Sequence, residues 1–265
     1  MSKLGAALRS GTGVLGGLLD RILPARLMEA LIAARFKRKP GDVLEGIGPS
    51  LNRKPNLDNR PQDLEVKGEI GFEHLAVLYS STSLDHAISS MTVRQGAYLF
   101  GLIREMGARK IVEIGRFKGG TTVIMAAAMG NRGRLWSIDL GFKEAYLNPG
   151  RSWDAMLRDT LATFGLSNVE ILVGDSRIIE VSFDGPLDLL MIDGDHSYEG
   201  VRSDFDRFGR LVRVGGAVLF DDAAGDGVFP SHEDTVGRLV REIASTGGYQ
   251  LVKSVNRMAH LTRLR

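Results

Sequence analysis

The chain has 265 residues, of which 43% are hydrophobic and 25% are charged, with a formal net charge of +2. These values are ordinary for a globular protein, and the length suits one large domain or one domain with an appendage. The absence of cysteine excludes disulfides and thiolate metal sites, so any metal must be bound by oxygen or imidazole. No apolar run reaches the roughly 18 residues that a membrane span requires, and we expect a cytoplasmic protein.

Positive charge is concentrated near the N-terminus. Residues 1–40 carry eight lysines and arginines against two acidic residues, a net charge of +6 that leaves −4 for the rest of the chain. Within this part, residues 26–39 have apolar side chains near helical spacing, which predicts a basic amphipathic helix. Such a helix is solvated, packs in a dimer, or contacts a partner or an anionic membrane. Residues 40–63 hold four of the eight prolines, so we interpret residues 1–63 as a helical arm and linker.

Helices and strands alternate from residue 94 onward. In chain order we predict a helix at 94–107, a strand at 110–115, a helix at 119–130, a strand at 134–140, a helix at 152–165, strands at 168–176 and 187–194, a helix at 197–212, a strand at 215–223, a helix at 235–246, and strands at 249–255 and 258–265. This alternation predicts an α/β fold with a parallel sheet covered on both faces. The last two strands are joined by a short turn around Asn256, so they must be antiparallel.

Acidic residues end every predicted parallel strand. They are Glu113, Asp139, Asp175, Asp193 and the pair Asp221 and Asp222. Ligands of open α/β sheets bind at this carboxyl edge. Turn chemistry explains an acidic residue at the end of one strand, but acidic residues at the ends of all five strands indicate a binding site. Because buried like charges repel, a cation, a proton or solvent must offset the repulsion.

A glycine-rich loop, EIGRFKGGTT, joins the first strand to the next helix. Glycine lets backbone N–H groups approach a ligand closely. The spacing is not the dinucleotide pattern, and Thr121 stands where a phosphate-binding loop has lysine. We therefore predict a ligand cradle that is not specialised for phosphate. Asp139 is placed to accept both hydroxyls of a ribose, and Asp175 with Ser176 to contact an adenine.

The segments VEIGRFKGGTT, WSIDL, LVGDS and MIDGDHSYEGV and the closing hairpin resemble a class I S-adenosylmethionine-dependent methyltransferase, from about Arg94 to the C-terminus. The resemblance implies a Rossmann-like, doubly wound, seven-stranded sheet in residues 64–265, a lid at 64–93, and S-adenosylmethionine as cofactor. It implies a methionine pocket at the glycine loop and a ribose contact at Asp139. The cofactor-binding residues implied are Glu113, Gly115, Gly119, Thr121, Asp139, Asp175, Ser176 and Asp193.

Three carboxylates at the ends of the fourth and fifth strands, Asp193, Asp221 and Asp222, suit a metal ion. Neighbouring parallel strands lie about 4.8 Å apart, so these side chains are able to share one ion. An all-oxygen site suits Mg²⁺, or else Mn²⁺ or Ca²⁺. The pattern IDGDHSYEG followed by LFDD is similar to the metal-dependent O-methyltransferases of the catechol type and of the macrocin and mycinamicin type.

The resemblance implies that the metal lowers the pKa of a substrate hydroxyl and that a nearby base takes its proton. His196 is the first candidate because its ordinary pKa is near neutral, and Asp195 is the second. The catechol enzymes have lysine at this point, so both candidates stay open. Among the other histidines, we expect His260 to be structural and His232 to lie near the active edge.

We therefore predict an S-adenosylmethionine-dependent O-methyltransferase, assisted by a divalent metal such as Mg²⁺, that acts on a sugar or a polyhydroxylated small molecule. The alternatives are a metal-independent methyltransferase, a nicotinamide-dependent oxidoreductase, which Asp139 fits but the glycine spacing does not, and a nonenzymatic membrane-associated or scaffold protein. We expect a homo-oligomer. We do not expect nucleic-acid binding, because basic residues gather only at the N-terminus.

Overall fold

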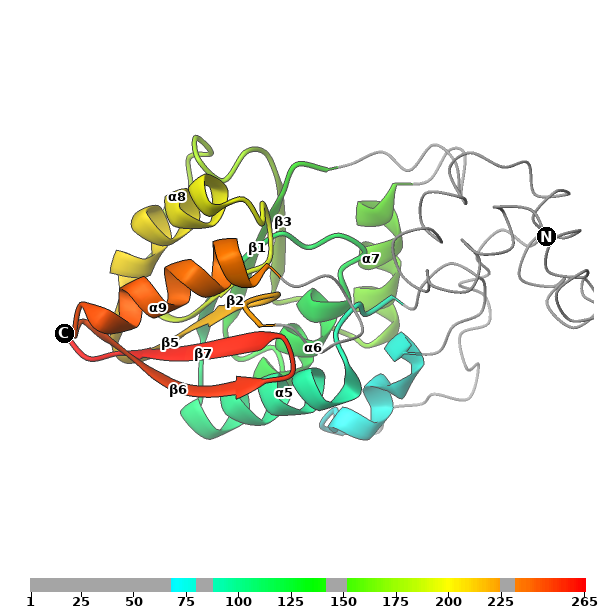
Figure 1. Cartoon of the computed structure of the whole chain (residues 1–265). Helices are drawn as coiled ribbons and strands as arrows, with labels where there is room; N and C mark the ends of the chain where they lie inside the picture. Colours follow the sequence, from blue (N-terminus) through cyan, green and yellow to red (C-terminus); the bar gives the residue numbers. More distant parts are fainter. Residues whose placement is uncertain (1–67, 80–87, 142–151, 225–231) are drawn as a thin grey trace, which may run out of the picture.

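The computed structural model of the chain describes residues 68–79, 88–141, 152–224 and 232–265 (Figure 1). The arm and linker predicted for residues 1–63 lie outside these ranges, as do residues 64–67 and 80–87 of the predicted lid region. Within the described ranges, no helix is both long enough and apolar enough to cross a membrane.

The described strands form one seven-stranded sheet with the order β3-β2-β1-β4-β5-β7-β6. The strands are β1 (Lys110–Ile114), β2 (Arg134–Asp139), β3 (Val169–Val173), β4 (Leu187–Ile192), β5 (Val212–Phe220), β6 (Tyr249–Val255) and β7 (Met258–Arg263). The first five strands are parallel, whereas β7 pairs antiparallel with both β5 and β6. The predicted fold, a mostly parallel Rossmann-like sheet with an antiparallel C-terminal hairpin, is confirmed.

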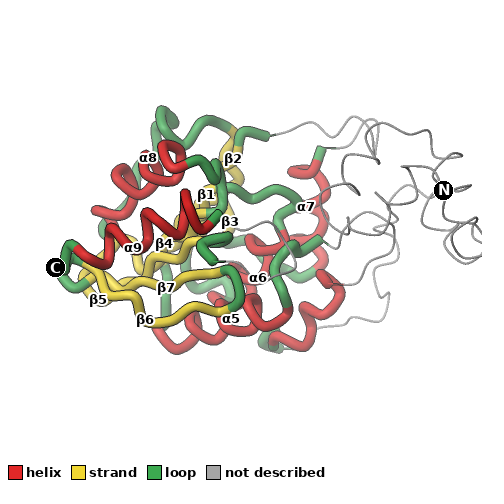
Figure 2. The backbone as a smooth tube through the Cα atoms, viewed as in Figure 1, coloured by secondary structure: helices red, strands yellow, loops and turns green. Residues whose placement is uncertain are grey.

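Helices cover both faces of the sheet (Figure 2). They are η2 (Phe72–Tyr79), α5 (Val93–Met106), α6 (Gly120–Met129), α7 (Trp153–Thr163), α8 (Tyr198–Phe208), η3 (Gly209–Leu211), η4 (Glu233–Gly237) and α9 (Arg238–Ser245). Apolar side chains of η2, α5, α6 and α7 form one core cluster, and those of α8 and α9 form the other. The sheet is thus doubly wound, as two covered faces require.

Strand β4 contributes buried side chains to both core clusters. Leu189 and Met191 are buried in the cluster under α5 and α6, whereas Leu190 and Ile192 are buried in the cluster under α8 and α9. Successive side chains of a strand point to opposite faces, so a continuous apolar run fills two cores. The run ends at Asp193, where β4 reaches the carboxyl edge of the sheet.

The strand order reverses between β1 and β4, with β2 and β3 on one side of this pair and β5 on the other. The connections after β1 and β4 therefore leave in opposite directions, which opens a crevice at the carboxyl ends of these strands. This crevice is where the glycine-rich loop and the predicted acidic residues meet.

Several predicted boundaries differ from the structure, for example the predicted helix 197–212, which ends at Phe208, and the predicted strand 168–176, which ends at Val173. Two of the differences have a local structural cause. Strand β5 begins at Val212 rather than residue 215, because Val212 already pairs with Leu187 before a bulge in the register. Helix α9 begins at Arg238 rather than residue 235, because the preceding turn is the π-helical segment η4. The described part of the lid region includes η2, whose Leu75 and Leu78 are buried in the core; its role as a lid stays a prediction.

Candidate active site

A cleft of about 440 Å³ lies at the carboxyl ends of β1 to β4, a size typical of small-molecule sites. Five of the predicted cofactor residues line it, namely Gly115, Asp139, Asp175, Ser176 and Asp193. The cleft also includes Asp204 of α8, which we did not predict. Asp204 is buried on the face of α8 that also carries Val201 and Phe208. Its helical spacing from these two apolar residues is the sequence signal that could have identified it.

Gly115 directly follows β1 and has a left-handed backbone conformation that only glycine adopts readily. Its φ is +83°, and a Cβ atom there would lie 2.1 Å from the carbonyl oxygen of Asp193. The N–H of Gly115 donates to the carbonyl of Ile138 at 2.9 Å. The ends of β1, β2 and β4 are therefore in direct contact at this residue, which brings the glycine loop against the tip of β4.

Asp139 at the end of β2 holds the glycine loop in place. Its Oδ2 accepts hydrogen bonds from the N–H groups of Arg116 at 2.9 Å and Phe117 at 3.1 Å. Its Oδ1 accepts from the N–H of Gly141 at 2.8 Å. Because a carboxylate has about four acceptor positions, Asp139 retains capacity for a ribose hydroxyl while it fixes the loop.

Three predicted cofactor residues are not among the residues that line the cleft: Glu113, Gly119 and Thr121. Glu113 is fully buried below the loop, where its Oε2 accepts from the hydroxyls of Thr122 at 2.6 Å and Ser137 at 2.5 Å. Burial raises the pKa of Glu113 to about 7. Gly119 caps α6 with a φ of +84°, and Thr121 is buried in the first turn of this helix.

The end of β3 brings Asp175 and Ser176 to the cleft wall. Arg177 donates to the partly exposed carboxylate of Asp175 at 2.9 Å and lowers its pKa to about 2. The Ser176 hydroxyl donates to Oδ1 of Asp204 at 2.6 Å, and burial raises the pKa of Asp204 to about 6. This end of the cleft therefore offers a charged rim and a buried polar pair.

The tip of β4 distinguishes the two candidate bases. His196 Nε2 lies 3.4 Å from Oδ1 of Asp193, and its Nδ1 lies 3.6 Å from Oδ2 of Asp222. The hydrogen bond to Asp193 is the main reason why the pKa of His196 is raised. Asp195 instead accepts from the N–H of Ser197 at 2.9 Å, and this bond lowers the pKa of Asp195. His196 thus lies between two carboxylates, whereas Asp195 is bonded to the backbone just before α8, and the identity of the base stays a prediction.

The tip of β5 places two acids in different surroundings. Asp221 is buried and accepts from the Gln95 side chain at 2.8 Å. Burial raises the pKa of Asp221 to about 7, with further increases from Asp193 and Asp222. Asp222 has a φ of +56°, and its Oδ1 accepts from Arg257 Nη1. The charges of Asp193, Asp221 and Asp222 therefore affect one another, but the structure does not bring the oxygens of all three within 4.8 Å of one another, as the predicted metal site requires.

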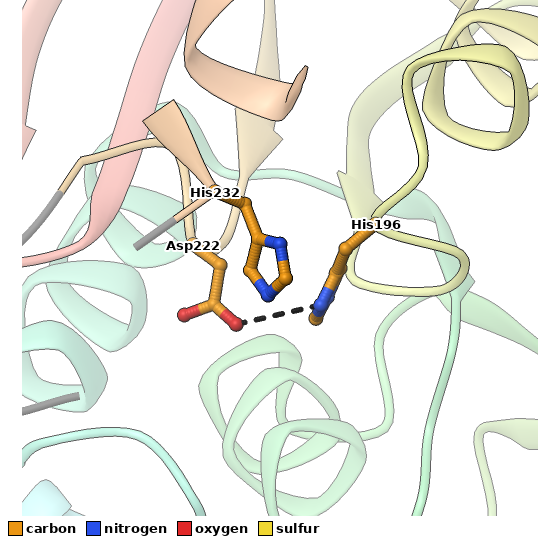
Figure 3. Close-up of side chains that lie close together, drawn as sticks. All are labelled: His196, Asp222 and His232. Atoms are coloured by element: carbon orange, nitrogen blue, oxygen red, sulfur yellow. Dashed lines mark ion pairs between the residues drawn. The ribbon is translucent and has the colours of Figure 1, made fainter. Parts of the chain in front are cut away.

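Figure 3 shows the side chains of His196, Asp222 and His232 lying close together. In the described part of the chain, the only set of three histidine or acidic ligand atoms within 4.8 Å of one another is that of His196, Asp222 and His232. The rings of His196 and His232 lie 4.6 Å apart. The expectation that His232 lies near the active edge is met, although its proximity to His196 was not predicted.

Gln95 and Arg257 are the polar residues of this region that we did not predict. Gln95 belongs to the capping box of α5, in which its Oε1 accepts from the N–H of Thr92 at 3.0 Å. The spacing of Thr92 and Gln95 is a recognisable helix-start signal, but it does not reveal a contact with Asp221. Arg257 lies in the hairpin turn between β6 and β7, and its contact with Asp222 depends on β7 lying beside β5.

Comparison with known proteins identifies the kind of domain. A family model described as a methyltransferase domain matches residues 112–223. A catechol O-methyltransferase of Niastella koreensis is 29% identical over 174 residues, which are 62% of this chain and 73% of that protein. A flavonoid 3',5'-methyltransferase of Vitis vinifera is 27% identical over 153 residues, 57% of this chain and 63% of that protein. A further curated relative, from Arabidopsis thaliana, is matched over only 62% of its length.

The fold is also that of solved methyltransferases. The O-methyltransferase TomG from Streptomyces achromogenes, whose structure contains S-adenosylmethionine (SAM), has a TM-score of 0.55 and 21% identity over 76% of this chain and 93% of that chain. An O-methyltransferase from Bacillus cereus, in complex with S-adenosylhomocysteine (SAH), has a TM-score of 0.53 and 19% identity over 76% of this chain and 94% of that chain.

Proposed function

Because the chain belongs to the class I S-adenosylmethionine-dependent methyltransferases, we propose that it transfers the methyl group of this cofactor to a hydroxyl of a small molecule. The observation that carries the proposal is the position of Asp193. This residue lines the cleft at the strand tips, and its side chain also contacts His196. A methyl donor in the cleft would therefore lie beside a group able to accept a proton.

The cofactor would occupy the cleft between Gly115 and Asp175. Asp139 would accept a ribose hydroxyl, and Ser176 with Asp175 would face the adenine. Glu113 and Gly119 would act from beneath by shaping the loop, since both are buried around it. Thr121 would contribute from the first turn of α6, where backbone N–H groups face the loop.

His196 would act as the base. In the transfer, an oxygen lone pair of the acceptor forms the new bond to the methyl carbon, and the bond between sulfur and methyl breaks. The sulfonium becomes a neutral thioether, and the hydroxyl proton moves to His196. Since His196 must be neutral to accept it, the raised pKa of His196 predicts that turnover increases as the pH rises above about 6.5.

We place the proposed divalent cation at the same edge, where the three carboxylates would have to move closer together to share it. Burial and their mutual charge raise the pKa of Asp193 and Asp221, so added positive charge there would relieve an unfavourable arrangement. The residues that would hold the ion are Asp193, Asp221 and Asp222, whose oxygen ligands suit Mg²⁺. When bound, the ion would supply Lewis acidity that lowers the pKa of the acceptor hydroxyl.

We propose a sugar or another polyhydroxylated small molecule as the acceptor. Catechol-type phenols are a second candidate class, because curated relatives are named catechol and flavonoid methyltransferases. Both classes present neighbouring hydroxyl groups. A homo-oligomeric state, a cytoplasmic location and a contact of the basic N-terminus with a membrane or partner stay predictions.

The test is a methyl-transfer assay with S-adenosylmethionine and a panel of sugars and catechols, in which SAH formation is measured with Mg²⁺ and with a chelator. The variant His196→Gln should lower kcat by roughly 10²- to 10⁴-fold without weakening cofactor binding, which calorimetry measures. Asp139→Ala should weaken cofactor binding. Asp221→Asn and the chelator should both reduce turnover.

Each alternative has its own outcome. Turnover that neither the chelator nor Asp221→Asn changes would leave a metal-independent methyltransferase. Calorimetric binding of a nicotinamide cofactor in place of S-adenosylmethionine would favour the oxidoreductase. Binding of neither cofactor would contradict the proposal and favour a scaffold protein.

A further inference from the structure

The group formed by His196, Asp222 and His232 has the composition of a transition-metal site. Its three ligand atoms lie within 4.8 Å of one another and come from three different segments: the end of β4, the end of β5 and the start of η4. Figure 3 shows a ring nitrogen of His232 facing the gap between the Asp222 carboxylate and His196. Two imidazoles and one carboxylate form the ligand set of several zinc enzymes.

The space between His196 and Asp222 suits an ion. Nδ1 of His196 and Oδ2 of Asp222 lie 3.6 Å apart, too far for a good hydrogen bond. Two ligand atoms that each lie 2.0–2.2 Å from a tetrahedral ion are separated by about 3.4 Å. Small side-chain rotations would therefore bring these atoms to coordinating distance.

The outer contacts of the ligands orient them for metal binding. Nε2 of His196 lies 3.4 Å from Oδ1 of Asp193. When Nε2 donates its proton there, the Nδ1 lone pair of a neutral His196 faces the Asp222 carboxylate, and either a proton on Nδ1 or a metal ion would lie between these two acceptors. A metal-bound histidine whose other nitrogen donates to a carboxylate is a recurring arrangement in zinc sites.

Asp222 is held so that it presents one oxygen to the gap. Arg257 Nη1 donates to Oδ1 of Asp222, which leaves Oδ2 toward His196. The main chain supports the same arrangement, since the N–H of His232 lies 3.3 Å from the carbonyl oxygen of Asp222. The His196 side chain is 28% exposed, so an ion would reach the site and keep a position open to solvent.

We propose that His196, Asp222 and His232 bind a borderline divalent cation, such as Zn²⁺ or Co²⁺, separately from the all-oxygen set of Asp193, Asp221 and Asp222. Imidazole ligands favour these ions over Mg²⁺. The two sets share Asp222, so the two kinds of ion compete. This part rests on the proposed function: an ion on Nδ1 of His196 removes the base, so Zn²⁺ inhibits methyl transfer.

The test is a titration of the metal-free full chain with Co²⁺, followed by the visible absorption of tetrahedral Co²⁺ and by displacement with Zn²⁺. One equivalent should bind. His232→Gln and Asp222→Asn should weaken Co²⁺ binding at least tenfold. Asp193→Ala, which removes the outer contact with Nε2 of His196, should weaken it roughly 10- to 100-fold. Thermal unfolding of each variant checks that the fold is retained.

Two controls separate this site from other sites. Asp221→Asn should retain Co²⁺ affinity, because Asp221 belongs only to the all-oxygen set. His74→Gln removes a histidine in η2, outside this region, and should also retain it. Equal affinity in the wild type and His232→Gln would overturn the proposal, as would an Asp221→Asn loss as large as that of His232→Gln.

Failure of the proposed function has a different signature. It would appear as absent binding of S-adenosylmethionine and absent methyl transfer with Mg²⁺, while the Co²⁺ spectrum and its loss in His232→Gln remain. Failure of the metal proposal would leave cofactor binding and turnover intact.

Discussion

Buried carboxyl groups lower the stability of the folded domain at neutral pH. Glu113, Asp204 and Asp221 all have a pKa raised by burial, to about 7, about 6 and about 7. A carboxyl group whose pKa is raised in the folded state binds protons more tightly there than in the unfolded chain. The folded state therefore loses stability as the pH rises from the unfolded pKa to the folded pKa. Each of these acids thus costs stability at neutral pH.

Glu113→Gln tests this cost at a carboxyl group that does not line the cleft. The amide oxygen of glutamine is able to accept from Thr122 and Ser137 as Oε2 of Glu113 does, but the side chain does not ionise. For Glu113 the window runs from pH 4.5 to about 7. We expect the free energy of unfolding of the variant, relative to wild type, to increase by roughly 2–3 kcal/mol between about pH 5 and about pH 8. Denaturant unfolding at the two pH values measures it, and a constant difference would contradict the assignment.

At the scale of elements, the loop between β1 and α6 requires glycine at residue 115 for two reasons: a left-handed backbone conformation and a close approach to the backbone of Asp193. Gly115 and Gly165 both have positive φ values, +83° and +62°. A Cβ atom at Gly115 would collide with the backbone of Asp193, whereas a Cβ atom at Gly165 would meet nothing within 4 Å. Alanine substitutions at the two glycines therefore measure different effects. At Gly165 the substitution adds only conformational strain, whereas at Gly115 it also disrupts the close approach between β1 and β4.

Gly165→Ala should cost roughly 1–2 kcal/mol, the strain of a left-handed residue with a side chain. Gly115→Ala should cost clearly more, because the tips of β1 and β4 must also move apart. We expect it to abolish S-adenosylmethionine binding, while Gly165→Ala retains binding. Denaturant unfolding and calorimetry measure the two effects. Similar costs in both variants would show that the contact with Asp193 contributes little.

Across the whole molecule, the cleft draws on the ends of four strands, so ligand binding should stabilise the folded domain as a unit. At about 100 times its dissociation constant, a ligand that binds only the folded state contributes about 2.7 kcal/mol. For a domain of this size we expect SAH to raise Tm by roughly 5–10 °C. Differential scanning calorimetry measures the shift. Asp139→Ala should reduce it at the same ligand concentration, and an unchanged shift would place the ligand elsewhere.

Local patterns in the sequence were sufficient for the element order and for the parallel sheet with its terminal hairpin. Apolar periodicity and glycine punctuation act over a few residues, so they can be read along the chain. The same patterns placed Gly115, Asp139, Asp175, Ser176 and Asp193 at one edge of the sheet, because parallel strands carry their carboxyl ends to the same side. The predicted start of α9 was wrong by three residues, because the sequence pattern does not reveal the π-helical turn that precedes this helix.

Contacts between distant segments were decided only by the tertiary structure. The sequence does not say that β7 inserts between β5 and β6, so it does not predict that Arg257 meets Asp222. It does not say that Gln95 at the start of α5 faces Asp221, or that His232 packs against His196. Strand order and side-chain direction come from packing the two cores, which involves residues far apart in the chain. The local signals of residue type and spacing do not contain that information.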